Sequence, residues 1–414
     1  MKTHNDSPRI PRLRFPEFQN AGEWEVKKLG EVANFLKGRG ISKSDINNNG
    51  TQPCIRYGEL YTHYNEVIKE IKSFTNLNGE GLILSEPNDV IIPSSGETKE
   101  EIATASCVKL GGVALGGDLN ILRSSLVNGE FLAYYLSHGL KKTISKIAQG
   151  DTVVHLYAAQ LKKLTIRVPK AKEEQEKIAA CLSSLNEVIA GEREKLALLQ
   201  QHKKGLLQQL FPQEGETVPK LRFKEFEDSG EWDYFNGDKL FEPIVNKNHN
   251  SDLPILAITQ EHGAIPREMI DYHVSVTDRS IESYKVVEVG DFIISLRSFQ
   301  GGIEYSKFKG LCSPAYVILR KKTELENDFY RHYFKTTSFI QDLNKNLQGI
   351  RDGKMISYKQ FSEILIPFPS LPEQQKIAAC LSSLDDLIAA QTEKIELLEQ
   401  HKKGLVQGLF PVGN

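Results

Sequence analysis

The clearest pattern in the chain is a regular spacing of apolar residues in two long stretches, residues 174–212 and 373–411. The apolar side chains recur at alternating spacings of four and three, which is the seam of a coiled coil. The pattern therefore predicts two helices, each roughly 55 Å long at ~1.5 Å per residue. One row of the predicted seam consists of Ile178, Leu185, Glu192, Leu199, Leu206, Ile377, Leu384, Gln391, Leu398 and Leu405.

The two stretches are copies of each other, with 27 of 39 aligned positions identical at an offset of 199. The repeat extends further, because PRLRF (11–15) and GEW (22–24) return as PKLRF (219–223) and GEW (230–232). Internal repetition on this scale defines the architecture of a chain. We infer a unit that occurs twice and consists of a short entry segment, a globular block and a long helix. Ser370 with Glu373 resembles a capping box for the second helix.

An antiparallel pairing of the two helices places every polar interruption of the seam symmetrically. With Glu192 opposite Gln391 at the midpoint, Lys203 and Lys402 lie at equal distances on either side of it. Polar residues in a seam fix its register at a cost in stability. We therefore predict an antiparallel, pseudo-twofold pair within one chain. A seam does not identify its partner, so packing of each helix against another chain remains an alternative.

The two globular blocks, about 22–170 and 230–369, have largely unlike sequences. Both contain short apolar, β-rich runs between Gly, Pro, Asn and Ser, and each has one predicted helix, near 129–148 and 327–347. We interpret them as two α+β domains of one mixed α/β fold, joined by the helix pair. The predicted boundaries are 1–170 for the first domain with its entry segment, 171–212 for the first helix, 213–369 for the second domain and 370–414 for the second helix.

Composition is that of a globular protein with 40% hydrophobic and 26% charged residues. The sequence contains no apolar run of the ~18 residues that a membrane helix needs, no signal peptide and no CxxC pair among its five cysteines, so we expect a cytoplasmic protein. The net charge is −2 and the pI is near 6.6. A DNA-binding protein usually carries a basic surplus. If this chain binds DNA, its positive charge is local or a partner supplies the phosphate contacts.

Catalytic motifs are missing. The sequence has no Walker A, GxGxxG, HExxH or GxSxG motif. Asp89 followed by Glu97 and Lys99 resembles a Mg²⁺-dependent nuclease site, but the equivalent residues after Asp291 lack the Glu-x-Lys. A polar surface loop is the better interpretation.

Loop residues that can donate to or accept from base edges are the candidates for DNA contact. Any single one is more often a solvated surface residue, so the prediction rests on the sets. The first block contributes Lys37, Arg39, Lys43, Arg56, Tyr57, Ser94, Ser95, Thr98 and His155. The second block contributes Lys247, Asn248, His249, Gln260, Arg267, Arg297, Ser298, Gln300, Arg351 and Lys354.

The doubled PxLRF…GEW entries and the two EQ(E/Q)KIAACLSSL…HKKGLxQxLFP helices make the chain resemble a type I restriction–modification specificity subunit. The resemblance covers nearly the whole chain. It implies two target-recognition domains that each read half of a split double-stranded DNA site, and a helix pair that sets the spacing. It also implies docking of two modification subunits that use S-adenosylmethionine, joined by restriction subunits that use ATP and Mg²⁺, with no cofactor and no catalysis in this chain.

Two other classes of protein remain open from the residues alone. One is a stand-alone nuclease or methyltransferase, and the other is a two-headed coiled-coil adaptor that binds proteins instead of DNA.

Overall fold

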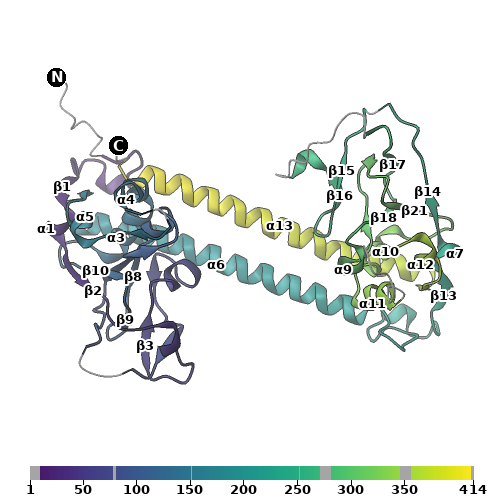
Figure 1. The fold of residues 1–414 in the computed structure, drawn as a ribbon, viewed down its shortest axis with the longest axis horizontal. Coiled ribbons are helices and arrows are strands. Elements are labelled where there is room, and N and C mark those ends of the chain that lie inside the picture. Colours follow the sequence, from purple (N-terminus) through teal and green to yellow (C-terminus); the bar gives the residue numbers. More distant parts are fainter. Residues whose placement is uncertain are drawn as a thin grey trace. The chain divides into compact units, whose positions relative to one another are not determined.

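The computed structural model describes residues 10–77, 81–150, 152–250, 252–270, 281–345 and 356–411. The chain divides into two compact units (Figure 1). Unit 1 comprises Met1–Arg193 and Glu393–Asn414, and unit 2 comprises Glu194–Thr392. Unit 2 is therefore a continuous stretch of chain, whereas unit 1 is assembled from both ends of the sequence.

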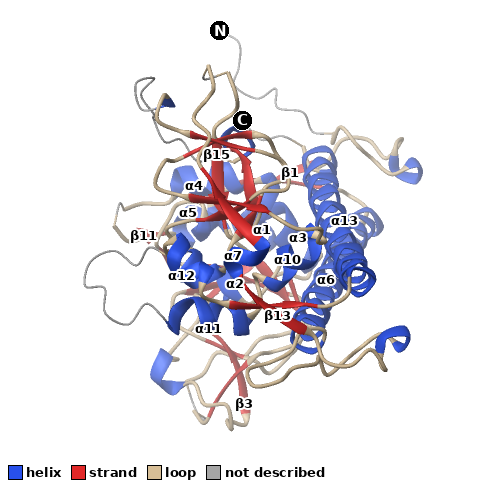
Figure 2. Ribbon diagram, turned by 90° about the vertical axis from the view of Figure 1, so that its right-hand side faces the viewer, coloured by secondary structure: helices blue, strands red, loops and turns tan. Residues whose placement is uncertain are grey.

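The two repeated stretches form the long helices α6 (Lys172–Gln209) and α13 (Leu371–Leu409). Each helix contributes to both units. In unit 1 the ion pair of Glu192 with Lys394 and the shared core of Ile178 with Leu405 join low numbers of α6 to high numbers of α13. The two segments are therefore antiparallel and lie side by side (Figure 1 and Figure 2).

Unit 2 repeats this arrangement with the other halves of the helices. Lys203 pairs with Asp385, and Leu206 shares a core with Ile377, so these two segments are also antiparallel. The predicted antiparallel pairing of the helices is thus confirmed within each unit. The twofold relation between the units stays a prediction.

The block of unit 1 is built on a five-stranded sheet in the order β2-β10-β6-β8-β4. These strands are β2 (Asn34–Lys37), β10 (Leu119–Arg123), β6 (Asp89–Pro93), β8 (Ser106–Val108) and β4 (Val67–Ile68). Smaller sheets join β5 (Ser73–Thr75), β3 (Gln52–Ile55) and β9 (Ala114–Leu115), then β1 (Glu25–Lys28) and β12 (Thr165–Val168), then β7 (Ser95–Gly96) and β11 (Val154–His155). The helices of this block are α1 (Leu29–Val32), α2 (Glu59–Thr62), α3 (Gly129–Tyr134), the π-helical turn η4 (Tyr135–Gly139), α4 (Lys141–Ile147) and α5 (Ala158–Lys162).

The block of unit 2 is built on a four-stranded sheet in the order β14-β21-β18-β19. These strands are β14 (Phe241–Ile244), β21 (Val317–Lys321), β18 (Phe292–Ile294) and β19 (Glu304–Tyr305). Strand pairs are β13 (Asp233–Asn236) with β22 (Leu365–Phe368), β15 (Leu256–Thr259) with β16 (Gly263–Pro266), and β17 (Lys285–Val287) with β20 (Gly310–Cys312). The helices are α7 (Gly237–Leu240), α9 (Ser298–Gly301), α10 (Asn327–Tyr333), α11 (Thr337–Lys345) and α12 (Tyr358–Ser362).

The common frame of the two blocks is visible in the sheets. The antiparallel order β2-β10-β6 in unit 1 corresponds to β14-β21-β18 in unit 2, and β1-β12 corresponds to β13-β22. The prediction of two mixed α/β domains of one fold is confirmed.

The predicted single helix in each block is wrong in detail, because both helices are interrupted. In unit 1 the chain leaves α3 through the π-helical turn and begins α4 only at Lys141, after Leu140 with φ −112°. In unit 2, α10 ends at Tyr333 and α11 begins at Thr337, with Thr336 donating its hydroxyl to the Tyr333 carbonyl.

Candidate nucleic-acid interface

A buried carboxylate at the start of each long helix fastens the entry segment to it. In unit 1, Arg14 donates two hydrogen bonds of 2.7 Å to Glu174, and Trp24 Nε1 donates a third at 3.1 Å. Glu174 is only 1% exposed. A charged, bidentate pair with every oxygen used is the arrangement that tolerates burial. We call these three side chains the clasp of unit 1.

Unit 2 contains the same clasp. Arg222 donates to both oxygens of Glu373, at 2.7 and 2.8 Å, and Trp232 Nε1 donates at 3.1 Å. The carboxylate that the sequence suggests as part of a capping box is therefore engaged by the entry segment. The repeated PxLRF and GEW motifs thus hold each block on its helix in the same way.

A second pair of equivalent carboxylates fixes the central strand of each block. Asp89 Oδ1 and Oδ2 accept from Arg123 at 2.9 and 2.8 Å, and Asp291 accepts from Arg320 at 2.7 Å on both oxygens. Asp89 also accepts from the backbone N–H of Glu86. Both oxygens of Asp89, which lies in β6, are thus engaged in a buried structural pair, whereas Glu97 and Lys99 are exposed, which argues against a nuclease site.

Five of the predicted DNA-contacting residues of unit 1 come together beyond the ends of β2 and β6. Ser95 Oγ lies 3.3 Å from His155 Nδ1, because β7 pairs with β11. Lys37 lies opposite Asn120 in the sheet, and Asn120 in turn donates to the carbonyl of Leu156. The other two members of this group are Arg39 and Ser94. The Arg39 N–H donates to the Leu115 carbonyl. The Ser94 N–H donates to the Asp118 carbonyl, and the Ser94 carbonyl accepts from the Leu156 N–H.

Arg56 and Tyr57 lie next to this group. Arg56 directly follows β3, and the carbonyl of the last strand residue, Ile55, accepts from the Gly116 N–H. Gly38 packs against the same glycine, because a Cβ atom on Gly38 would lie 1.9 Å from the Gly116 carbonyl oxygen. The segments after β2 and β3 therefore both contact the backbone of Gly116, which directly follows β9. Lys43 and Thr98 are not among these contacts, since Lys43 is in the separate turn η2 (Lys43–Asp45) and Thr98 Oγ1 accepts from Glu101 N–H.

In unit 2, the predicted residues that converge are Gln260, Arg267 and Arg297. Gln260 Nε2 donates to the Arg297 carbonyl at 3.3 Å. Arg267 and Arg297 line one cavity of about 470 Å³ together with Tyr316. Arg297 stands three residues beyond β18, as Ser95 stands three residues beyond Ile92 in the equivalent strand β6. The two blocks thus present unlike side chains at one position of the same frame.

The remaining candidates of unit 2 have other surroundings. Ser298 is 1% exposed and its hydroxyl accepts from Ser295 N–H, so it supports the turn from inside, whereas its neighbour Gln300 is exposed. Lys247 and Asn248 are exposed in the loop after β14, and a ring nitrogen of His249 lies 3.1 Å from the Tyr284 carbonyl. Arg351 and Lys354 lie outside the described residues.

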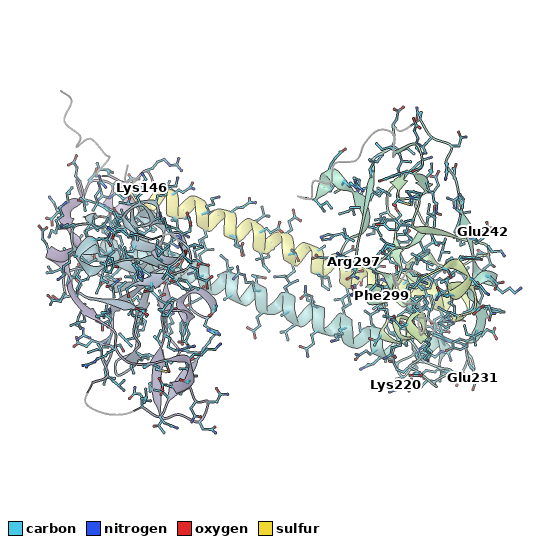
Figure 3. The ribbon with its side chains drawn as sticks, in the orientation of Figure 1. Lys146, Lys220, Glu231, Glu242, Arg297 and Phe299 are labelled. Carbon is cyan, nitrogen blue, oxygen red and sulfur yellow. The ribbon has the colours of Figure 1, made fainter. Side chains whose placement is uncertain are left out.

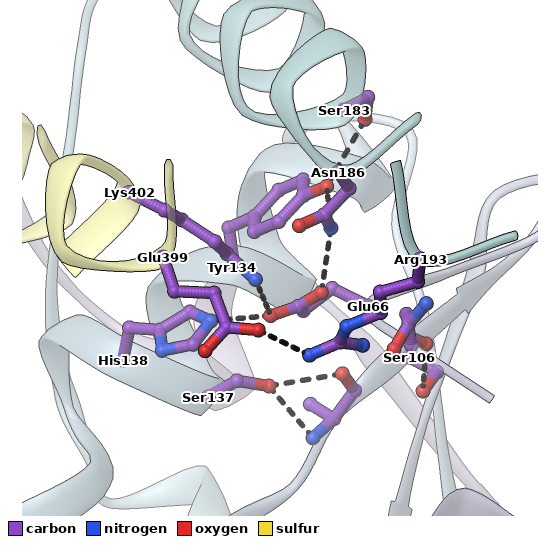
Figure 4. A network of polar contacts seen from close by, with 12 residues as sticks. Glu66, Ser106, Tyr134, Ser137, His138, Ser183, Asn186, Arg193, Glu399 and Lys402 are labelled. Carbon is purple, nitrogen blue, oxygen red and sulfur yellow. Dashed lines mark hydrogen bonds and ion pairs between the residues drawn. The ribbon is translucent and has the colours of Figure 1, made fainter. Parts of the chain in front are cut away.

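The predicted seam residues of both helices are all buried or half-buried. The two seam lysines meet carboxylates. In unit 1, Lys402 Nζ lies 3.0 Å from Glu66 Oε1, and Glu66 also bonds His138 and Asn186 (Figure 4). Burial opposes ionisation of Glu66, but the His138 hydrogen bond and the Lys402 charge hold the pKa of this carboxyl well below its ordinary value.

In unit 2, Lys203 meets Asp385 of the opposing helix, and Asp385 is also 3.4 Å from Arg331. The adjacent His332 is 4% exposed, and burial together with the charge of Arg331 lowers its pKa to about 3. Sequence reasoning missed Glu66 and Asp385. The signal that pointed to them was the pair of lysines inside an apolar seam, since a buried ammonium requires an acidic partner.

Large apolar side chains outside the seam remain exposed on both helices. They are Val188 (47%) and Leu397 (57%) in unit 1, and Leu387 (57%) and Leu198 (59%) in unit 2. Val188 and Leu387 are repeat equivalents, and so are Leu198 and Leu397. Each unit therefore exposes one such residue from each helix. Sequence reasoning also missed these positions, although their repetition could have indicated them.

Within the described residues, no three His, Cys, Asp or Glu side chains are grouped so that they could hold a metal ion. None of the helices formed by these residues is long and apolar enough to span a bilayer.

Comparison with protein families gives one family model, described as the type I restriction modification DNA specificity domain. It matches twice, over residues 21–201 and 207–400. The two matches cover both blocks and most of both long helices.

Two relatives come from Methanocaldococcus jannaschii. The putative type I restriction enzyme MjaX specificity subunit is 28% identical over 71% of this chain and 71% of its own length. The type I restriction enzyme MjaVIII specificity subunit is 23% identical over 96% of this chain and 93% of its own.

Among solved structures, the S subunit of a type I restriction-modification system from M. genitalium has a TM-score of 0.61 at 15% identity. That alignment covers 98% of this chain and 100% of the other. A chain from a study of complex assembly in the type I R-M system has a TM-score of 0.55 at 18% identity, covering 94% and 97%. These likenesses establish the shared fold.

Proposed function

Because the chain belongs to the type I restriction modification DNA specificity family and carries two such domains, we propose that each unit reads one half of a split, asymmetric sequence in double-stranded DNA. The observation that carries this proposal is that the two units share one fold but differ in the candidate contact residues. Both units have the same clasp and the same strand order, yet Ser95 in one corresponds to Arg297 in the other. Two heads of one fold with different contact residues fit a target whose halves differ.

The candidate contact residues suit direct readout better than phosphate binding. The groups around Ser95 and around Arg297 include hydroxyl, imidazole, amide and guanidinium groups, which can donate to or accept from base edges. The chain as a whole carries a net charge of −2. Since phosphate contacts supply most of the affinity for DNA, the partner subunits would supply much of the backbone binding.

We also propose that this chain is not catalytic and holds no cofactor of its own. The acidic residues nearest to a nuclease pattern are engaged in structure, as Asp89 is with Arg123. S-adenosylmethionine, ATP and Mg²⁺ would then be bound by the modification and restriction subunits.

The helix pair would set the spacing of the half-sites and dock two modification subunits. Each unit exposes one apolar residue from each helix at the same level of the antiparallel pair, Val188 with Leu397 and Leu198 with Leu387. In heptad terms these are g and c positions, which are neighbours on one flank of a helix. Two equivalent apolar sites outside the seam fit two copies of one partner.

The docking proposal is tested by the double variant Val188→Asp, Leu397→Asp, measured by native mass spectrometry with purified modification subunits. We expect loss of one modification subunit and retention of the other. The matched control is Leu198→Asp, Leu387→Asp, which should also leave a single modification subunit bound. Full occupancy in both variants would contradict docking at these sites.

The function is tested by mapping methylated adenines genome-wide in cells that express this chain with its modification subunits. We expect a bipartite, asymmetric motif with a fixed spacer. Replacing residues 233–368 by the corresponding block of another family member should change one half of the motif only. A motif that changes in both halves, or no methylation and no DNA binding by the assembled complex, would contradict the proposal.

A further inference from the structure

The backbone of Arg297 is fixed from both sides. Its N–H donates to Ser295 Oγ at 3.2 Å, and its carbonyl accepts from Gln300 N–H at 2.9 Å and from Gly301 N–H at 3.3 Å. Gln260 Nε2 reaches the same carbonyl from the turn between β15 and β16. A residue held in this way presents its side chain from a rigid base, which is what specific recognition needs.

The guanidinium of Arg297 is exposed and forms no hydrogen bond or ion pair with another described residue (Figure 3). Most structural arginines of this chain are paired with a carboxylate, as Arg320 is with Asp291. Arg297 therefore has five donors available for a ligand.

The cavity beside Arg297 contains a second unsatisfied guanidinium. Arg267 belongs to the turn η6 (Arg267–Met269) and is half-buried, and its Nη1 is buried without a hydrogen-bond partner among the described residues. Thr259, Ser295 and Tyr316 line the same cavity. A buried donor without a partner is unfavourable, and more so when it is charged, so its presence indicates an acceptor that arrives with a ligand.

The neighbours of Arg297 include groups that suit a base edge. Leu296, which also lines the cavity, is 50% exposed, and Gln260 and Gln300 are exposed amides next to the same turn. An apolar side chain can contact a thymine methyl group, and amides can bond the amino and carbonyl groups of base edges in the major groove. The hydroxyls and the second guanidinium of the cavity also suit a phosphate, so the experiment below separates a base contact from a backbone contact.

We propose that Arg297 reads a guanine in the half of the target bound by unit 2, donating its two guanidinium nitrogens to guanine O6 and N7. This pairing is the commonest specific arginine contact in the major groove. Arg267 lines the same cavity and offers its Nη1, unpaired among the described residues, to an acceptor of the bound DNA. The inference rests on the proposed function of unit 2 and adds the base and the residue that reads it.

The test uses the full chain assembled with its modification subunits and maps the methylation motif for wild type, Arg297→Ala and Arg297→Lys. We expect Arg297→Ala to lose preference about 5- to 150-fold at one G·C position of one half-site, with the other half unchanged. Arg297→Lys should retain part of the preference, because lysine also donates to O6 and N7. The matched control is Ser95→Ala at the equivalent position of unit 1, which should leave that G·C position untouched.

A duplex with 7-deazaguanine at the affected position separates the base from the backbone. It should weaken binding of the wild-type complex and have little further effect on Arg297→Ala. Uniform weakening across all sequences with a salt slope reduced by about one would identify a phosphate contact and overturn the proposal. An unchanged motif in Arg297→Ala would overturn it as well. Failure of the wild-type complex to recognise any bipartite site would instead refute the proposed function.

Discussion

In unit 1 the seam lysine Lys402 meets Glu66 from the globular block, whereas in unit 2 Lys203 meets Asp385 from the opposing helix. The clasps, by contrast, are the same in both units. The clasp is thus alike in the two units, but the helix-to-helix pair of Lys203 with Asp385 has no counterpart in unit 1, where Asn186 stands at the position equivalent to Asp385. The lysine in unit 1 instead depends on a residue of the unrepeated sequence. The helix pair of unit 2 neutralises its own lysine, so its block can be exchanged with fewer constraints than the block of unit 1.

The largest expected loss of stability comes from removing the clasp, which both units contain. Glu174→Ala should destabilise unit 1, and Glu373→Ala unit 2, each by about 3–5 kcal/mol, because a buried arginine loses its counter-charge. The chain has only two tryptophans, Trp24 and Trp232, one buried in each unit. Fluorescence-monitored unfolding in Trp232→Phe and Trp24→Phe backgrounds therefore reports each unit separately. Clearly unequal losses would show that the two clasps are not equivalent.

Acidification should distinguish the units next. Burial lowers the pKa of His332 in unit 2 to about 3, below its ordinary value of about 6.5. Protonation therefore favours the unfolded state, so stability present above pH 6.5 is lost as the pH falls, by about 3 kcal/mol at pH 4. The equivalent residue in unit 1 is Tyr134, whose pKa is raised by burial and which stays neutral throughout.

Unit 1 should respond only at lower pH. The lowered pKa of Glu66 contributes stability above its ordinary value near 4.5 that is lost as the pH falls further. Hydrogen exchange of β18 compared with β6 between pH 7 and 4.5 measures the difference. His332→Gln should remove most of the loss in unit 2. An equal loss of stability in both units between pH 7 and 4.5 would contradict the prediction that His332 causes the loss.

Replacing a seam lysine should lower the free energy of unfolding by less than loss of a clasp does, and by different amounts in the two units. Lys402→Met leaves Glu66, which is 10% exposed at its side chain, with only His138 and Asn186 as side-chain partners, and should cost about 1–3 kcal/mol in unit 1. Lys203→Met leaves Asp385 half-exposed beside Arg331 and should cost less than about 1 kcal/mol in unit 2. Unfolding in the same single-tryptophan backgrounds measures the loss of stability in each unit. A larger loss for Lys203→Met than for Lys402→Met would contradict this prediction.

The smallest effect is expected for an ion pair at the surface. Arg193 and Glu399 are 61% and 45% exposed at their side chains (Figure 4), so Arg193→Gln should cost about 0–1 kcal/mol. The variant also serves as a control for mutation of the helices. A loss comparable to that of Lys402→Met would mean that exposure does not separate these pairs.

The sequence predicted the frame of the molecule because the frame is repeated. Seam spacing predicted both helices and their antiparallel pairing, and Trp24 and Glu174 both lie in segments that are repeated. Their mutual contact could not be read in advance, since it joins residues 150 positions apart. The sequence suggested Glu373 as part of a capping box, but it did not indicate that Arg222 and Trp232 of the entry segment bind the same carboxylate.

The candidate site was less predictable. Loop chemistry selected Ser95 and His155, and the structure brings them together, but it places Lys43 elsewhere and turns Ser298 inward. Polar residues in loops look alike in sequence, and only strand pairing decides which ones meet. The partner of Lys402 could not be located because Glu66 lies in the block without a repeat.

Unit 2 is one continuous stretch, whereas unit 1 needs residues beyond Glu393 to complete its core, including Phe410, which stacks on Tyr135 at 5.1 Å. During synthesis on the ribosome, unit 2 can therefore close first, although unit 1 begins first. Until α13 emerges, the ring of Tyr135 lacks its cover, and nascent chains with exposed apolar surface are prone to aggregation. The order of translation thus makes the first half of this protein the last to mature.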